Sequence, residues 1–158
     1  MIAIHIKYSL KGAIVLMLLG VFAFTSSCKK EEEIAEAKAP VIGVISIGPD
    51  TVTQFTDSVF VEIQYEDPNG DIGSDDPDGQ DIEVKDSRLN TPDYYHLKPL
   101  TPAGYSLFIR GKLRIKLNTL FLLGNGQFET VTFTIKLRDQ SGKWSNEVTT
   151  DPIVIKAE

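Results

Sequence analysis

The feature that most constrains the fold is a strict two-residue alternation of apolar and polar side chains. In residues 57–66, Val59, Val61, Ile63 and Tyr65 recur at every second position. Successive side chains of a strand point to opposite faces, so this pattern predicts a strand with one buried face and one wet face. The same alternation runs through 110–117 and 131–137, and weaker candidates are 41–47, 81–86, 147–156 and a segment near 94–98.

Turn-forming pairs separate these candidates, and no segment has the period of a long amphipathic helix. Asn69-Gly70, Asn125-Gly126 and Ser141-Gly142 are such pairs. Six or seven antiparallel strands in residues 41–158 predict an all-β domain, an immunoglobulin-like β-sandwich. A small β-barrel is the alternative. The single cysteine excludes an internal disulfide, so core burial must hold the domain together.

Residues 1–27 predict a secretory signal peptide of the lipoprotein type. Lys7 and Lys11 precede an unbroken apolar run over 13–24, and small residues follow before Cys28. The run is shorter than the roughly 20 residues that a helix needs to cross a bilayer. We therefore expect cleavage before Cys28 and lipid on its sulfur, although Thr25 stands where such signals usually carry Leu. An uncleaved membrane anchor with an incidental thiol is the alternative.

Residues 28–40 predict a lipidated N-terminus and a charged linker that ends at Pro40. By composition alone, its first part is a solvated tether. That part also resembles the Lys-then-acidic export signal of surface-exposed Bacteroidota lipoproteins. The resemblance implies a location on the outer membrane facing the cell exterior, and retention in the periplasm is the alternative. The residues of this candidate signal are Lys29, Lys30, Glu31, Glu32 and Glu33.

The most unusual segment is the acidic loop 66–79, with the sequence EDPNGDIGSDDPDG. Calcium takes about six to eight oxygen ligands, so oxygen-bearing side chains at alternate positions of a turning loop favour a calcium site. The spacing departs from an EF-hand loop, because counting from Asp67 puts Ile72 at the sixth position, where that loop requires Gly. Asp, Asn and Gly are also ordinary turn formers, and a solvated acidic turn is the alternative.

Topology adds Asp139 to this candidate site. In an immunoglobulin-like sandwich, the loops after the second and sixth strands lie at the same pole. The second predicted strand runs into Asp67, and the sixth runs into Asp139 if two strands fit between residues 81 and 100. The carbonyl oxygen of Ile72 or Gly73 is a further candidate ligand. The predicted side-chain ligands of calcium are Asp67, Asn69, Asp71, Asp75 and Asp139.

Three segments resemble one family, the uncharacterised Bacteroidota surface lipoproteins. Residues 66–73 are similar to its F-x-D-x-D-G-D-I-G loop, with Pro68-Asn69 where Gly-Asp is commoner. Residues 100–104 look like its L-T-P-x-G segment, and 137–146 look like its D-x-x-G-x-x-S-N turn. The resemblance covers nearly the whole chain and implies an immunoglobulin-like fold, with no known activity.

Charge and residue content narrow the function. The formal net charge of −6 becomes −8 once Lys7 and Lys11 leave with the signal, which disfavours nucleic acid as a partner. His96 is then the only histidine, and no nucleophile elbow, phosphate loop or zinc pattern occurs. We expect a non-enzymatic binding or structural module, held on a membrane by lipid, with a protein or glycan ligand and calcium as its candidate cofactor. A small cell-envelope hydrolase or glycan-processing accessory protein is the alternative, because two carboxylates suffice for glycoside hydrolysis.

Overall fold

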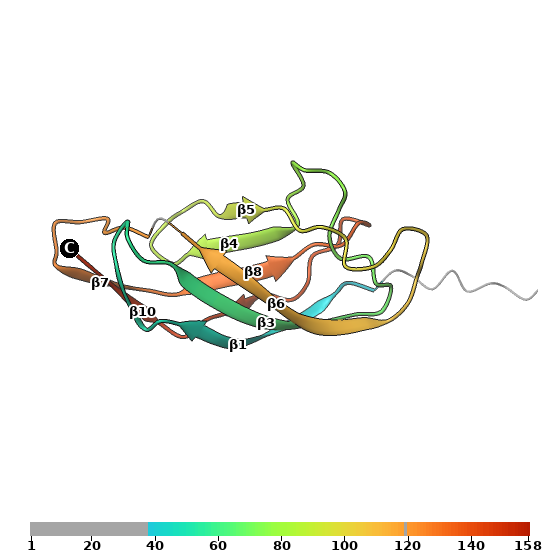
Figure 1. The fold of residues 1–158 in the computed structure, drawn as a ribbon, viewed down its shortest axis with the longest axis horizontal. Helices are drawn as coiled ribbons and strands as arrows, with labels where there is room; N and C mark the ends of the chain where they lie inside the picture. The colour runs from blue at the N-terminus through green and yellow to red at the C-terminus, as the bar shows by residue number, and fades with distance from the viewer. Residues whose placement is uncertain (1–37, 119) are drawn as a thin grey trace, which may run out of the picture. The chain divides into compact units, whose positions relative to one another are not determined.

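The computed structural model describes residues 38–118 and 120–158, which form ten β-strands and no helix (Figure 1). This confirms the predicted all-β class. Within these residues, no helix is long and apolar enough to cross a membrane. The predicted signal peptide, Cys28 and the segment Lys29–Glu33 lie outside the described residues. The strands are β1 (Val41–Gly48), β2 (Thr51–Thr53), β3 (Val59–Asp67), β4 (Ile82–Asp86), β5 (Asp93–Tyr95), β6 (Ile109–Leu117), β7 (Phe128–Val131), β8 (Phe133–Leu137), β9 (Val148–Thr149) and β10 (Ile153–Lys156).

The strands form two layers, as in a β-sandwich (Figure 1). One layer has the order β1-β3-β6, and all its neighbours are antiparallel. The other layer contains a four-stranded sheet with the order β5-β4-β8-β9 and a three-stranded sheet with the order β2-β10-β7. The second sheet continues the first, because β7 leads into β8 and β9 leads into β10. β7 and β8 are halves of one strand interrupted at Thr132, and β9 and β10 are halves of one interrupted at 150–152. With β2 counted as the continuation of β1, seven strands result, the upper number predicted for the sandwich.

The core lies between the two layers and is made by the predicted inward faces. On β3, Val59, Val61 and Ile63 are fully buried. On β8, Ile135 and Leu137 are fully buried and pack in the same cluster. The register read from the alternation is therefore correct, because a slip of one residue would have exposed all of these side chains.

The structure departs from the predicted strands where the alternation is short or broken. β2 is only three residues long and was not predicted. The predicted strands 131–137 and 147–156 are each interrupted once. Trp144 is half-buried and is not part of the core cluster. Its ring lies 5.2 Å from Lys136 Nζ and 5.7 Å from Arg138 Cζ, so it packs against cationic side chains.

The two ends of the sandwich carry different loops. We call the end formed by residues 68–81, 97–108 and 138–147 the acidic pole. We call the end formed by residues 54–58, 118 and 120–127 the far end. Val41 pairs with Glu66 near the end of β3, so β1 begins at the acidic pole. The chain therefore enters the domain beside the loop that the sequence singled out.

Candidate cation site at the acidic pole

Three segments distant in the sequence meet at the acidic pole, and backbone hydrogen bonds join them. Leu100 N donates to Ile72 O at 3.1 Å, and Leu107 N donates to Asn69 O at 3.2 Å. Ile72 also forms a β-bridge with Asp139. These are the three segments that carry the family resemblance, and the topology brings them to one place. The prediction that the loops after β3 and β8 lie side by side is therefore correct.

Asp67 closes the turn that follows β3. Its side chain is fully buried, and its two carboxylate oxygens accept hydrogen bonds from backbone N–H groups. Asn69 N lies 3.3 Å from Oδ1, and Asp71 N lies 2.8 Å from Oδ2. Between them, Gly70 has a φ of +71°, and a Cβ there would lie 2.5 Å from Leu107 O. Only glycine fits this position, and the Asp67 carboxylate is committed to holding the turn.

Asp139 closes the turn that follows β8 with only one of its oxygens. Its Oδ1 accepts the Lys143 N–H at 2.7 Å and the Ser141 hydroxyl at 2.8 Å. Its Oδ2 is buried and makes no hydrogen bond to any described residue. The side chain is 5 % exposed, so water reaches this oxygen poorly. A buried carboxylate oxygen without a partner is costly and calls for a proton, a water or a cation.

Asp71 interacts electrostatically with both of these carboxylates. Its Oδ1 is also buried and makes no hydrogen bond to any described residue. Burial raises the pKa of the Asp71 carboxyl above its usual range, and the negative charges of Asp139 and Asp67 raise it further. Asp139 and Asp67 therefore both lie close enough to Asp71 to repel its negative charge.

The other two predicted ligands are placed differently. Asp75 is exposed, and it lines the same surface hollow as Asp71. Asn69 is half-buried and takes part in the Asp67 turn through its backbone. In the part of the chain that the structure describes, no three Asp, Glu, His or Cys side chains are arranged to hold a metal ion. Of the five predicted ligands, Asp71 and Asp139 are the two that keep a buried carboxylate oxygen without a hydrogen bond to any described residue.

Thr101 is a candidate residue that the sequence analysis did not include. It is 9 % exposed, and its Oγ1 makes no hydrogen bond to any described residue. It lines a hollow of about 570 Å³ together with Asp71, Asp75 and the exposed Tyr105. A hydroxyl oxygen is an acceptable ligand for calcium. The only signal in the sequence is the Leu-Thr-Pro segment of the family resemblance, because Thr101 has no periodic pattern.

A second acidic group at this pole has a structural role. Asp81 Oδ2 accepts the Leu97 N–H at 2.9 Å and lies 3.1 Å from His96 Nδ1. Ser74 Oγ donates to the same oxygen at 3.2 Å. Asp81 therefore ties the acidic loop to the segment after β5. His96, the only histidine of the described residues, is used in this contact.

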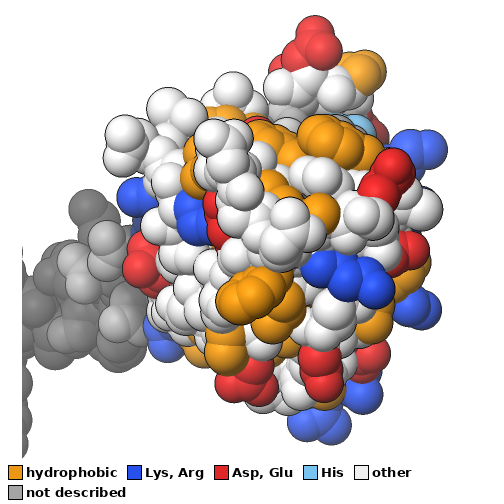
Figure 2. All heavy atoms as spheres, turned by 90° about the vertical axis from the view of Figure 1, so that its left-hand side faces the viewer, with side chains coloured by type: hydrophobic (Ala, Val, Ile, Leu, Met, Phe, Trp, Pro, Cys, Tyr) orange, Lys and Arg blue, Asp and Glu red, His pale blue; other side chains and the backbone are white. Residues whose placement is uncertain are grey.

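The far end carries exposed apolar side chains instead of acids. Figure 2 shows this end, where hydrophobic atoms gather near the centre among charged groups of both signs. Phe55 is 66 % exposed and Phe128 is 69 % exposed. The Phe55 and Phe121 rings stack with centroids 6.2 Å apart, and Phe55 adopts a φ of +60°, unusual for a bulky residue. No pattern in the sequence predicts this surface.

Comparisons of the chain with protein-family models, with curated proteins and with solved structures found no match.

Proposed function

We propose that this chain is a lipid-anchored module of the bacterial outer membrane that binds a partner without catalysis and whose acidic pole is stabilised by calcium. The observation that most supports the calcium is the pair of unpartnered, buried carboxylate oxygens, Asp71 Oδ1 and Asp139 Oδ2. A cation would satisfy both oxygens and would offset the burial and the neighbouring negative charges that raise the pKa of Asp71. A solvated acidic turn would leave neither oxygen buried.

The number of available donors predicts weak binding. Asp67 has both oxygens engaged with backbone N–H groups, so Asp71 and Asp139 would supply the free carboxylate oxygens. Thr101 Oγ1 and the nearby Asp75 would complete the shell, with water at the remaining positions. Few charged ligands and a partly open hollow suit a dissociation constant on the order of 10⁻⁴–10⁻³ M, as in other extracellular modules.

Thermal unfolding of the full chain in calcium and in chelator tests this proposal. At ten times the dissociation constant, calcium stabilises the fold by about 1.4 kcal/mol through mass action. We therefore expect the midpoint to rise by about 4–8 °C in a domain of this size. Asp71→Asn should abolish the rise, whereas Asp151→Asn, an exposed acid between β9 and β10, should leave it intact. No calcium effect in the wild type at millimolar concentration would contradict the site.

If Cys28 carries lipid, the chain enters the domain a short distance from the membrane. The predicted lipidated residue, Cys28, precedes β1 by the twelve residues 29–40, which reach at most about 40 Å when extended. Because β1 begins at the acidic pole, this arrangement would keep that pole close to the membrane and leave the strands and the far end accessible to a partner.

A Cys28→Ser variant tests the anchor. We expect it to leave the membrane fraction or to accumulate with its signal uncleaved, because lipid can no longer be attached. Mass spectrometry of the wild-type N-terminus should find acyl chains on Cys28, and an unmodified N-terminus at another residue would contradict the proposal. Replacing Lys29–Glu33 with alanines should remove protease accessibility on intact cells; unchanged accessibility would identify the stretch as a tether alone.

A further inference from the structure

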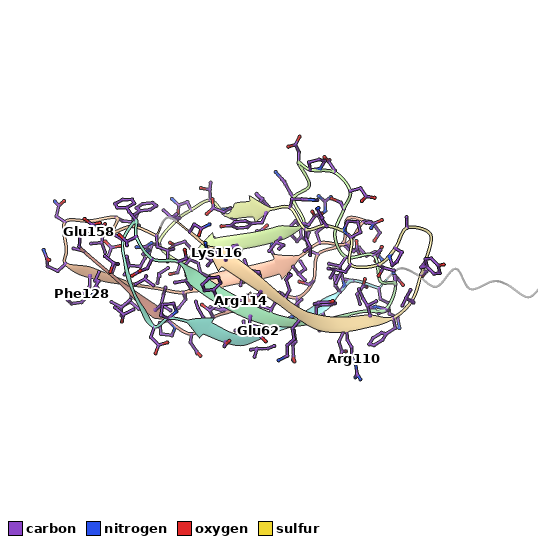
Figure 3. The ribbon with its side chains drawn as sticks, viewed as in Figure 1. Glu62, Arg110, Arg114, Lys116, Phe128 and Glu158 are labelled. Carbon is purple, nitrogen blue, oxygen red and sulfur yellow. The ribbon has the colours of Figure 1, made fainter. Side chains whose placement is uncertain are left out.

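β6 carries a row of cationic side chains along one face. Arg110, Lys112, Arg114 and Lys116 occupy alternate positions of the strand, and all four are exposed. Figure 3 shows Arg110, Arg114 and Lys116 following one another along the ribbon of β6. Residues 41–158 contain 18 acidic and 11 basic residues, so four of the eleven basic residues lie in one strand of an acidic domain. We call these four residues the basic row.

The neighbouring strand neutralises this row only in part. On β3, the residues paired with the row include two acids, Glu62 and Glu66. Lys112 Nζ lies 3.2 Å from Glu62 Oε1, in an exposed ion pair. Arg114, although paired in register with Glu62, places its guanidinium 4.1 Å above the ring of Phe60. The outer face of the β3-β6 pair therefore retains a surplus of positive charge.

β6 is also the edge of its layer. The order β1-β3-β6 gives it one neighbour, and no described residue outside β3 pairs with its backbone. An open edge presents unpaired N–H and C=O groups to solvent. Charged side chains along an edge prevent pairing with an identical edge, because like charges would then face each other. The same charges favour a strand that carries carboxylates.

We propose that β6 binds an extended acidic segment of a protein partner as an additional strand of this layer. Alternate residues of a strand are about 6.8 Å apart, so carboxylates at every second position of the segment would face the basic row one by one. The residues between them would lie beside the inner face of β6, where Leu113 is only half-buried. Main-chain hydrogen bonds would supply affinity, and the alternating charges would supply orientation and specificity. This inference does not depend on calcium or on the lipid anchor.

The test uses the full chain, purified in a non-ionic detergent, and a labelled nine-residue peptide in which Glu and Val alternate. Fluorescence anisotropy at low ionic strength should show saturable binding. The double variant Arg114→Glu, Lys116→Glu should weaken binding by about tenfold or more, because two attractive contacts become repulsive. Lys85→Glu makes one such charge reversal at an exposed position of β4, in the other layer, and should leave binding unchanged.

Two N-methylated peptides distinguish strand addition from simple attraction of a polyanion. An added strand uses the N–H groups of alternate residues for pairing and leaves the others free. One peptide is N-methylated at its Val residues and the other at its Glu residues, and both keep the same charge. Strand addition predicts that only one of the two loses binding. The proposal is overturned if both bind like the parent peptide, if a sulfated oligosaccharide of equal charge binds as tightly, or if the parent peptide does not bind at millimolar concentration.

Discussion

At the scale of single residues, three aspartates near the acidic pole have different roles because their carboxylate oxygens accept different numbers of hydrogen bonds. Asp67 receives a backbone N–H on each oxygen and serves as a turn-closing group. Asp139 receives its donors on Oδ1 alone, and Asp71 keeps Oδ1 buried and unpartnered. The sequence shows three similar carboxylates, and only the geometry separates a structural carboxylate from a candidate ligand.

The raised pKa of Asp71 predicts a particular pH dependence of stability. Its folded-state pKa lies above the ordinary value of 3.8, so the native state binds this proton more tightly than the unfolded state. In chelator, Asp71→Asn should therefore be more stable than the wild type near neutral pH, because it removes a repelled charge. The gap should close as the pH falls through the raised pKa, where the wild-type carboxyl becomes neutral too.

Urea unfolding at several pH values measures this gap. Because Asp71 is only partly buried, solvent screening keeps the expected difference at neutral pH below about 1 kcal/mol. Asp151→Asn, on an exposed segment, is the matched control and should show no such closing gap. A gap that widens on acidification would mean that Asp71 is stabilised in its charged form, which contradicts a raised pKa.

At the scale of the strands, the inward position of Phe133 on β8 can be tested directly. Its side chain is 3 % exposed within the core cluster. Phe133→Ala should lower the free energy of unfolding by about 3–5 kcal/mol, because it removes buried apolar surface and leaves a cavity. Thr134→Ala, on the outer face of the same strand, should cost less than about 1 kcal/mol. Equal costs, measured by urea unfolding, would contradict the register.

The strands that were predicted well are those whose two faces meet different environments. β3, β6 and β8 alternate because one face packs in the core and the other meets water. β2 was not predicted, because three residues are too few to show a clear alternation. Its partner strand, β10, also lies about a hundred residues further along the chain. The basic row of β6 was visible in the sequence as a wet face, but only the strand order shows that it borders an open edge.

The contacts of Arg88 are an example of interactions that the alternation of apolar and polar residues cannot predict. Arg88 forms ion pairs with Asp86 at 2.7 Å and with Glu129 at 2.6 Å, and it also donates to Phe121 O at 2.9 Å. Backbone N–H groups of Leu123 and Gly124 lower the pKa of the Glu129 carboxyl, and Arg88 lowers it further. The loop of residues 120–127 is thus held by polar contacts that have no periodicity, and no local signal in the sequence predicts them.

At the scale of the whole molecule, the candidate site was predictable in outline and not in detail. The order of strands predicts that the loops after β3 and β8 share a pole, and they do. The position of Thr101 beside them follows from a long irregular loop, whose contacts depend on backbone hydrogen bonds such as Leu100 N to Ile72 O. The exposure of Asp75 and the full engagement of Asp67 depend on turn geometry in the same way.

The antiparallel pairing of β1 with β3 determines how the domain would resist a pulling force. A lipid tether would pull on β1 at Val41, along the strand axis, and β1 pairs with β3 from Val41 to Gly48 with one bulge between Val44 and Ser46. Backbone hydrogen bonds between antiparallel strands run perpendicular to that axis, so the pull loads them in shear and all together, rather than opening them one after another. β3 then passes the load to β6 across nine paired positions. A partner held along β6 and a membrane holding Val41 would thus stretch one continuous three-stranded sheet in its mechanically strongest direction.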